Sequence, residues 1–142
     1  MDRTASAAWY GNLKEGKGKI STQSGVLKDS QYSFGTRFEN GIGTNPEELI
    51  AAAHAGCFTM ALSAQLTTAN LPPESLETTA KVTLDKTDAG PTITKIHLTT
   101  KAKVPNADKA AFDKAAQEAK ANCPISRLFK GNTDITLDAT LA

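Results

Sequence analysis

The longest apolar stretch of the chain covers residues 46–70 and contains no charged side chain after Glu48. Asn45 followed by Pro46 is typical of a helix start, because Asn caps the first free amides and Pro fits the first helical position. Glu48 lies three residues after Asn45 and would complete a capping box. Because apolar residues occur on every face, the pattern predicts one long buried helix.

Shorter patterns predict the other elements. Residues 32–38 alternate with period two, which predicts a strand with Arg37 on the face opposite its aromatic residues. The remaining predicted strands are 8–10, 18–22, 76–85, 92–104 (joined to 76–85 by a hairpin at 87–91) and 133–141, and the remaining helices are 108–120 and 125–129. This order predicts an α+β fold, and the length predicts a single domain over residues 1–142.

A membrane helix is the alternative reading of the apolar stretch. Residues 49–73 carry no Lys, Arg, Asp or Glu, and the stretch is long enough to span a bilayer. It is also rich in alanine and contains several polar residues, and it lacks basic flanks and an aromatic belt. We therefore favour the core helix of a protein that does not bind membranes.

Charge and composition narrow the class of protein. Sixteen Lys and Arg against fifteen Asp and Glu give a net charge of +1, with no basic run that would bind nucleic acid. No apolar stretch follows the first four residues, so we expect no signal peptide and a cytoplasmic location. In a reducing compartment, the two cysteines are more typical of reactive thiols than of a structural disulfide.

Cys57 lies in the middle of the predicted helix. A free cysteine there is often an inert core residue. To react, it must be a thiolate, yet apolar burial raises a thiol pKa and the helix N-terminus is too distant to lower it. A cation must therefore come from elsewhere. The nearest basic residue upstream is Arg37, whose alternative role is that of a solvated strand residue.

Two acids begin the helix. Glu47 lies ten residues before Cys57, which places it about 80° from the direction of the cysteine, whereas Glu48 lies on the opposite face. Glu47 could therefore hold an arginine on the cysteine side. The alternative for both acids is a first-turn position that the helix dipole favours.

Cys123 has a different setting, because the following Pro124 favours a helix break. If Pro124 opens a short helix, Cys123 is its N-cap and can move more freely than a residue in mid-helix. That asymmetry suits a pair in which Cys57 attacks and Cys123 resolves. A Cys57–His54 nucleophile pair is also open, whereas two histidines and two scattered cysteines make a poor zinc site.

Three stretches carry a resemblance to a known family: residues 16–27, residues 121–126 (ANCPIS) and above all residues 43–58 (GTNPEELIAAAHAGCF). They resemble the osmotically inducible protein C (OsmC) family along nearly the whole chain. The resemblance implies an intertwined homodimer, with antiparallel sheets wrapped around long central helices. It also implies reduction of organic hydroperoxides at two sites in the dimer interface.

The resemblance implies a role for four residues. Cys57 matches the peroxidatic cysteine, Cys123 the resolving one, Arg37 the arginine of the OsmC branch and Glu47 the glutamate that orients it. An external dithiol or lipoyl-type reductant would complete the cycle without a cofactor or metal, and apolar neighbours such as Phe58 and Met60 would favour organic peroxides. Two alternatives stay open: a non-catalytic redox-responsive binding protein and a structural stress protein with inert thiols.

Overall fold

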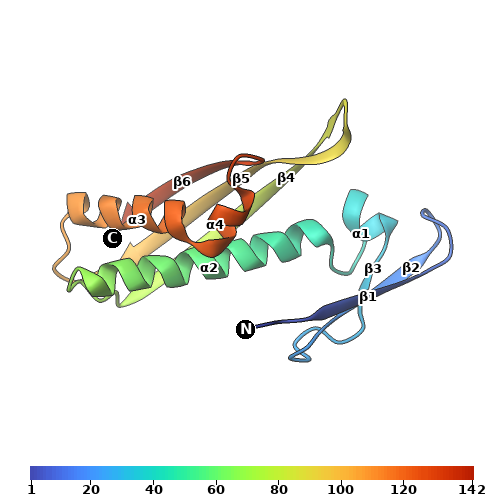
Figure 1. The fold of residues 1–142 in the computed structure, drawn as a ribbon, viewed down its shortest axis with the longest axis horizontal. Helices are drawn as coiled ribbons and strands as arrows, with labels where there is room; N and C mark the ends of the chain where they lie inside the picture. The colour runs from blue at the N-terminus through green and yellow to red at the C-terminus, as the bar shows by residue number, and fades with distance from the viewer. The chain divides into compact units, whose positions relative to one another are not determined.

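The computed structural model describes residues 1–142 and has the predicted α+β composition (Figure 1). In chain order the elements are β1 (Ala5–Tyr10), β2 (Lys17–Thr22), β3 (Ser30–Tyr32), α1 (Phe34–Phe38), α2 (Pro46–Thr68), β4 (Ser75–Thr87), β5 (Gly90–Lys103), α3 (Lys109–Asn122), α4 (Pro124–Phe129) and β6 (Asp134–Leu141). The chain divides into two compact units, Met1–Leu49 and Ile50–Ala142. That the two form a single domain stays a prediction.

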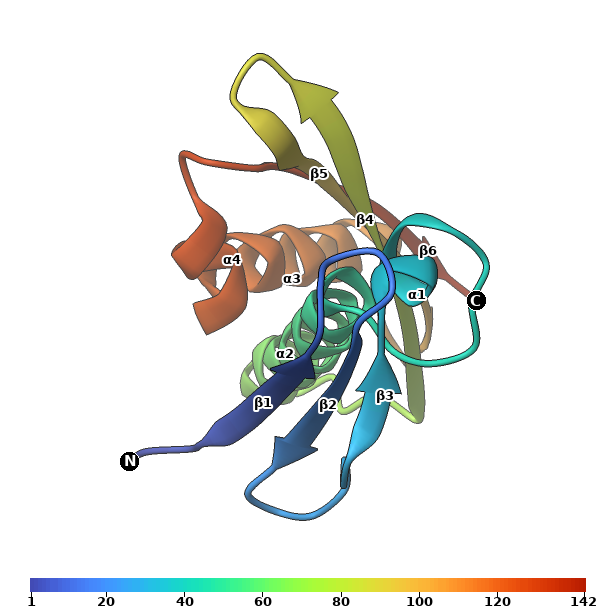
Figure 2. The same cartoon turned by 90° about the vertical axis from the view of Figure 1, so that its right-hand side faces the viewer.

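The first unit contains an antiparallel sheet in the order β1-β2-β3 (Figure 2). The rings of Trp9 and Tyr32 pack with their centroids 5.4 Å apart. Gly18 lies opposite Tyr32 in the register, and a Cβ there would come within 2.3 Å of the ring. The close approach of this ring to the backbone explains the glycine.

The strand predicted over residues 32–38 is wrong. β3 ends at Tyr32, and Phe34–Phe38 form the short helix α1, so that Arg37 lies in a last helical turn. Ser33 caps this helix: its hydroxyl accepts from the Thr36 amide at 3.2 Å, and the Thr36 hydroxyl accepts from the Ser33 amide at 2.8 Å. This reciprocal capping box stabilises a helix start over a continuing strand.

The long helix α2 is confirmed, with Pro46 as its first residue. The Asn45 side chain accepts from the Glu48 amide at 2.8 Å, which forms one half of the predicted capping box. α2 is long and apolar enough to cross a membrane by length and composition alone, a criterion that the core helix of a soluble protein also meets. Membrane insertion therefore gains little support.

Within the second unit α2 is buried on one side only, so its burial on every side, which requires a partner's helix, stays a prediction. Only four of its side chains are buried, and they form one stripe: His54, Phe58, Leu62 and Leu66. Met60, expected beside Phe58 as part of an apolar substrate surround, is 77% exposed, whereas Phe58 lies in the core. The second unit leaves the faces of α2 away from that stripe uncovered.

The second unit contains the sheet β4-β5-β6. β4 and β5 form the predicted hairpin across Asp88 and Ala89. The expectation of purely antiparallel sheets is wrong here, because β6 pairs parallel to β5. The physical reason is the connection: α3 and α4 carry the chain from the end of β5 back to the start of β6, and parallel strands require such a long crossover.

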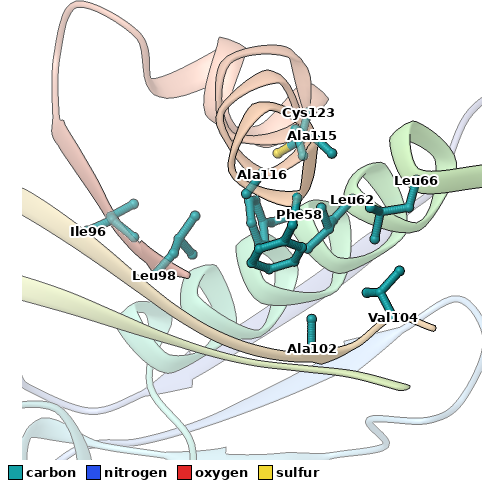
Figure 3. Packing of buried hydrophobic residues seen from close by; sticks show 12 residues of the cluster. Phe58, Leu62, Leu66, Ile96, Leu98, Ala102, Val104, Ala115, Ala116 and Cys123 are labelled. Carbon is teal, nitrogen blue, oxygen red and sulfur yellow. The ribbon is translucent and has the colours of Figure 1, made fainter. Parts of the chain in front are cut away.

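The core of the second unit lies between its sheet and the helices α2 and α3 (Figure 3). β5 contributes buried residues at alternate positions from Ile96 to Ala102, as a strand with one covered face must. Phe58 from α2 and Phe112 from α3 are its largest fully buried side chains. Cys123, between α3 and α4, is also completely buried in this cluster.

Candidate active site

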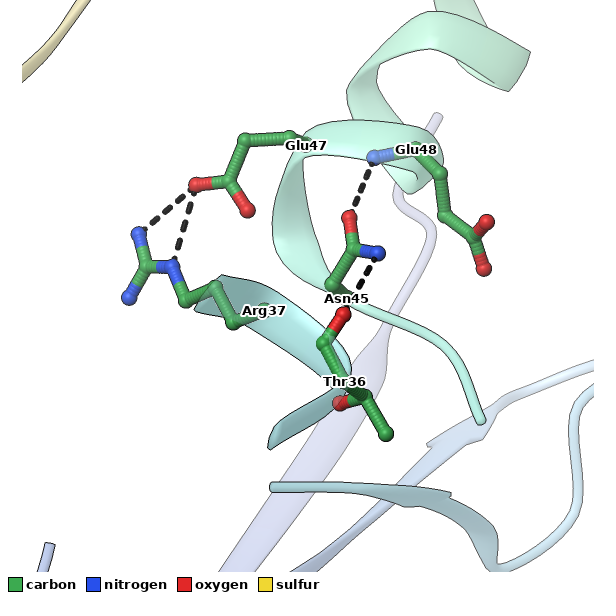
Figure 4. Close-up of polar contacts among 5 residues, drawn as sticks. All are labelled: Thr36, Arg37, Asn45, Glu47 and Glu48. Atoms are coloured by element: carbon green, nitrogen blue, oxygen red, sulfur yellow. Dashed lines mark hydrogen bonds and ion pairs between the residues drawn. The ribbon is translucent and has the colours of Figure 1, made fainter. Parts of the chain in front are cut away.

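Arg37 and Glu47 form an ion pair within the first unit (Figure 4). Arg37 donates from Nε at 3.1 Å and from Nη2 at 2.8 Å, and both bonds end on Oε1 of Glu47. The Arg37 side chain is 39% exposed and that of Glu47 only 12%. The second oxygen, Oε2 of Glu47, is buried and has no hydrogen-bond partner. The pair leaves Nη1 of Arg37 free to contact an anion.

Asn45 fixes the geometry of this ion pair. Its Nδ2 donates to the Thr36 carbonyl at 3.1 Å, and its Oδ1 accepts from the Glu48 amide (Figure 4). One side chain therefore ties the end of α1 to the start of α2. Because Arg37 and Glu47 are the immediate neighbours of these anchor points, their side chains are held within reach of each other.

Cys123 is both the C-cap of α3 and the N-cap of α4, as the following proline predicts. Its backbone amide donates to the Ala119 carbonyl at 2.9 Å, which ends α3. Its sulfur accepts from the backbone amide of Ser126 at 3.3 Å. Cys123 is thus a buried thiol with a backbone N–H aimed at its sulfur, in a bend between two helices.

Cys57 is partly buried, and both cysteines are free thiols. Burial raises the pKa of the Cys57 thiol; the backbone amide of Ile125 opposes this, and the neighbouring Cys123 thiol adds to it. Cys57 and Cys123, 66 residues apart in sequence, are therefore close neighbours. Because the raised pKa disfavours the thiolate, the second unit alone does not supply the activation that a nucleophile needs.

His54 does not bond to Cys57, so the Cys–His pair left open by the sequence is absent. Its Nε2 lies 2.7 Å from Ser126 Oγ, and its ring packs on Phe129 at a centroid distance of 6.0 Å. Ser126 Oγ in turn accepts from the Cys123 thiol at 3.2 Å. Ser126 was not predicted to be functional. Its position in the sequence could have indicated a contact with Cys123, because Ser126 lies three residues after this N-cap cysteine, in the turn that Cys123 caps.

The structure thus groups the predicted residues in two pairs. Arg37 and Glu47 lie together in the first unit, and Cys57 and Cys123 in the second. Their assigned roles stay predictions. No group of three or more His, Cys, Asp or Glu is placed to hold a metal ion.

We expect His54 to make the stability of the fold sensitive to acid. Burial lowers its pKa from the ordinary value of 6.5, so the folded state holds it neutral. Between 6.5 and the lower folded pKa, the unfolded chain binds a proton that the folded chain does not. We expect the stabilisation to be complete above about pH 6.5 and to fall as the pH drops through the folded pKa. Urea unfolding from pH 7.5 to 5 measures this.

His54→Gln keeps a polar side chain but cannot titrate, and it should flatten that part of the stability profile. His97→Gln is the matched control, because His97 is the other histidine and is partly exposed on the sheet. An unchanged acid slope in His54→Gln would show that His54 does not cause it.

The chain is similar in sequence to proteins of one known family. A family model described as "OsmC-like protein" matches residues 38–138. Peroxiredoxin OsmC of Escherichia coli strain K12 is 53% identical over 141 residues, which covers 99% of this chain and 97% of that protein. Organic hydroperoxide resistance protein OhrB of Bacillus subtilis is 30% identical over 122 residues, which covers 85% of this chain and 88% of that one.

Solved structures agree. The crystal structure of OhrB of Bacillus subtilis has a TM-score of 0.73 at 28% identity, covering 96% of this chain and 98% of that one. An OsmC-like protein from Mycoplasma pneumoniae has a TM-score of 0.78 at 14% identity, covering 100% and 98%, which supports the fold alone. With the family match spanning most of the chain and a full-length relative at 53% identity, the chain belongs to the OsmC family.

Proposed function

We propose that this protein is a thiol-dependent peroxidase that reduces organic hydroperoxides to alcohols. The observation that carries the proposal is the proximity of two free thiols, Cys57 in the middle of α2 and Cys123 at the break between α3 and α4. Two neighbouring free thiols suit a cycle through sulfenic acid and disulfide. The 53% identity to a peroxiredoxin supports the same chemistry.

In the first step, the Cys57 thiolate attacks the distal oxygen of the hydroperoxide. A sulfur–oxygen bond forms, the oxygen–oxygen bond breaks, and the alkoxide leaves and takes up a proton to give the alcohol. Cys57 becomes a sulfenic acid. Arg37 would stabilise the thiolate and the charge that develops on the leaving oxygen. Glu47 would hold its guanidinium through the charged hydrogen bonds described above.

In the second step, Cys123 attacks the sulfenic sulfur. A Cys57–Cys123 disulfide forms and water leaves, and an external dithiol or lipoyl-type reductant then restores both thiols by exchange. We place the reaction in the cytoplasm, where such reductants keep thiols reduced. Cys123 lies at the break between α3 and α4, where a backbone shift toward Cys57 would not have to unwind the middle of a helix.

The test is steady-state consumption of cumene hydroperoxide in the presence of excess dithiol. A peroxidase consumes many equivalents of peroxide per chain, with one alcohol formed for each. A redox-responsive binding protein, the second class of function, would stop after about one equivalent. A structural protein with inert thiols would consume none, and its cysteines would resist alkylation at neutral pH.

We further propose that the protein acts as a homodimer packed through α2. The exposed residues of α2 include a stripe of small or flexible apolar side chains: Ala52, Ala53, Gly56, Met60 and Ala64. Ala52 and Ala53 lie four and three residues before Gly56, and Met60 and Ala64 follow at intervals of four, which places the stripe on one face of the helix. A Cβ at Gly56 would meet nothing within 4 Å, so the chain itself does not explain that glycine. A second copy of α2 fits such a face.

Sedimentation velocity is expected to give a particle of twice the chain mass of 15.0 kDa. Gly56→Leu should shift the equilibrium toward monomer by at least tenfold, because a bulky side chain separates the helices. Leucine favours a helix over glycine by roughly 0.8 kcal/mol, so helix melting would not explain such a loss. Ala110→Leu, an exposed alanine of α3, is the matched control. A stable wild-type monomer would contradict the dimer.

A further inference from the structure

Three buried polar groups form a continuous row in the second unit. The Cys123 thiol donates to Ser126 Oγ at 3.2 Å, and Ser126 Oγ lies 2.7 Å from His54 Nε2. Cys123 and His54 are 0% exposed and Ser126 is 3% exposed. The row joins the predicted resolving cysteine to a histidine that the peroxidase chemistry above does not use.

The direction of hydrogen-bond donation along the row begins at the Cys123 thiol. Ser126 Oγ already accepts the thiol proton, so its own hydroxyl proton is available to donate to His54 Nε2. His54 then carries its single proton on Nδ1, an atom that is buried and has no hydrogen-bond partner. An imidazolium would place a charge here without a counterion, so the histidine rests as a neutral base.

No charged side chain contributes to the pKa of His54 in a way that would favour its protonated form. From α4, the groups facing it are the Ser126 hydroxyl and the Phe129 ring, while Arg127 and Lys130 are exposed. The titratable groups nearest along the row are the Cys123 and Cys57 thiols. Burial is the cause that lowers the His54 pKa, and no charged side chain contributes to the shift.

We propose that Ser126 and His54 form a proton relay that activates Cys123 for its attack on the Cys57 sulfenic acid. The proposal rests on the peroxidase function proposed above. Ser126 touches the reacting sulfur and is a catalytic residue. His54 acts through Ser126 and is a positioning residue that receives the proton.

The step balances without an added reagent. As Cys123 attacks, its thiol proton passes to Ser126 Oγ and the serine proton passes to His54 Nε2. The Cys123 sulfur forms a bond to the Cys57 sulfur, and the sulfur–oxygen bond of the sulfenic acid breaks. The departing hydroxide takes up the proton that His54 returns and leaves as water. The sulfenic sulfur is reduced and the thiol sulfur is oxidised.

A purely structural role for the row is the alternative, in which His54 and Ser126 only fasten α4 to α2. The two roles differ in their dependence on pH. With the relay, the attack needs neutral His54 but no base from solvent, so its rate stays flat from alkaline pH down through 6.5 and falls only as the pH drops through the lowered folded pKa of His54. Without the relay, Cys123 must lose its proton to solvent, and the rate rises by about tenfold for each pH unit until the thiol is ionised.

A single-turnover experiment on the full chain separates the steps. Reduced protein receives one equivalent of cumene hydroperoxide, and peroxide loss is followed beside intact mass after an acid quench with dimedone. Dimedone labels the sulfenic acid, and the disulfide appears as an unlabelled species that has lost two hydrogens. Wild-type protein that neither loses peroxide nor forms either species would refute the peroxidase function itself, and with it the relay.

The decisive variant is His54→Gln, which keeps a hydrogen-bond acceptor for Ser126 but cannot hold the proton. We expect peroxide loss within twofold of wild type and disulfide formation slowed by about 10²-fold at pH 7, in line with general base catalysis. The slowing should shrink as the pH rises. Ser126→Ala should behave in the same way, and Ser126→Thr should recover part of the rate because it restores the hydroxyl.

His97→Gln is the matched control and should leave both steps and their pH profiles unchanged. Far-UV circular dichroism checks that each variant is folded. If Ser126→Ala does not fold, His54→Gln alone decides the question. A folded His54→Gln that forms the disulfide at the wild-type rate, with the wild-type pH profile, would overturn the relay and leave the row a structural contact.

Discussion

Cys57→Ser is expected to abolish peroxide turnover, the largest effect of any single substitution in this chain. A serine hydroxyl does not ionise near neutral pH and does not form a sulfenic acid, so both steps of the cycle lose their reacting atom. Cys57 is partly buried, and Ser differs from it by one atom, so the fold should survive. Steady-state consumption of cumene hydroperoxide with excess dithiol measures the loss.

Cys123→Ser is the informative companion. It should still consume one equivalent of peroxide and then accumulate the Cys57 sulfenic acid or its overoxidised forms, because no thiol remains to resolve it. Mass spectrometry distinguishes these products from a disulfide. Normal multiple turnover in Cys123→Ser would show that another thiol, supplied by the reductant, performs the second step.

Local chemistry made most of the fold predictable. Asn45 and Pro46 mark the start of α2, and Pro124 separates α3 from α4, each through a fixed backbone preference that tertiary contacts did not override. The helix α1 was missed because Phe34 and Phe38, four residues apart, share a face in both a strand and a helix. In the helix the centroids of the Phe34 and Phe38 rings lie 4.9 Å apart. The Ser33–Thr36 capping box was the signal that separates the two readings.

Long-range pairing was beyond sequence reasoning. Nothing in residues 134–141 indicates a parallel partner, since the same alternation serves either direction of β6. Likewise, Cys57 and His54 lie three residues apart in sequence, whereas the partner of His54 is Ser126, 72 residues away. Periodicity locates a residue on a face of its own element and carries no information about which distant element covers that face.

The ion pair shows what sequence spacing can do. The helical angle between Glu47 and Cys57 separated Glu47 from Glu48 as the candidate to hold an arginine, and the pair with Arg37 is present. The pair is not the usual bidentate one, in which each arginine nitrogen donates to a different carboxylate oxygen. Here Nε and Nη2 of Arg37 both donate to Oε1 of Glu47, and Oε2 has no partner. A carboxylate held in this way fixes Nε and Nη2 of the guanidinium and leaves Nη1 without a partner.

Arg37→Ala is expected to slow peroxide reduction by roughly 10²–10³-fold, the usual cost of removing one preorganised charge donor. Burial already raises the pKa of the Cys57 thiol. In the proposed mechanism Arg37 is the cation that offsets this burial, so its removal should raise the Cys57 pKa further and deplete the thiolate. The fold should persist, because the Arg37 side chain is 39% exposed and lies outside the core. The pH dependence of Cys57 alkylation, measured beside the peroxide rate, tests both effects.

Arg37→Lys should recover only part of the rate, since an ammonium cannot offer Glu47 two donors and still present a planar edge to the peroxide. The peroxide rate of Glu47→Gln should lie between the rates of Arg37→Ala and Arg37→Lys. In this variant Arg37 keeps its charge but loses the carboxylate that holds it. Arg127→Ala is the matched control: Arg127 also lies in the last turn of a short helix and is exposed. Should Arg127→Ala depress the rate and Arg37→Ala leave it intact, the activating arginine is Arg127 and the role proposed for Arg37 is wrong.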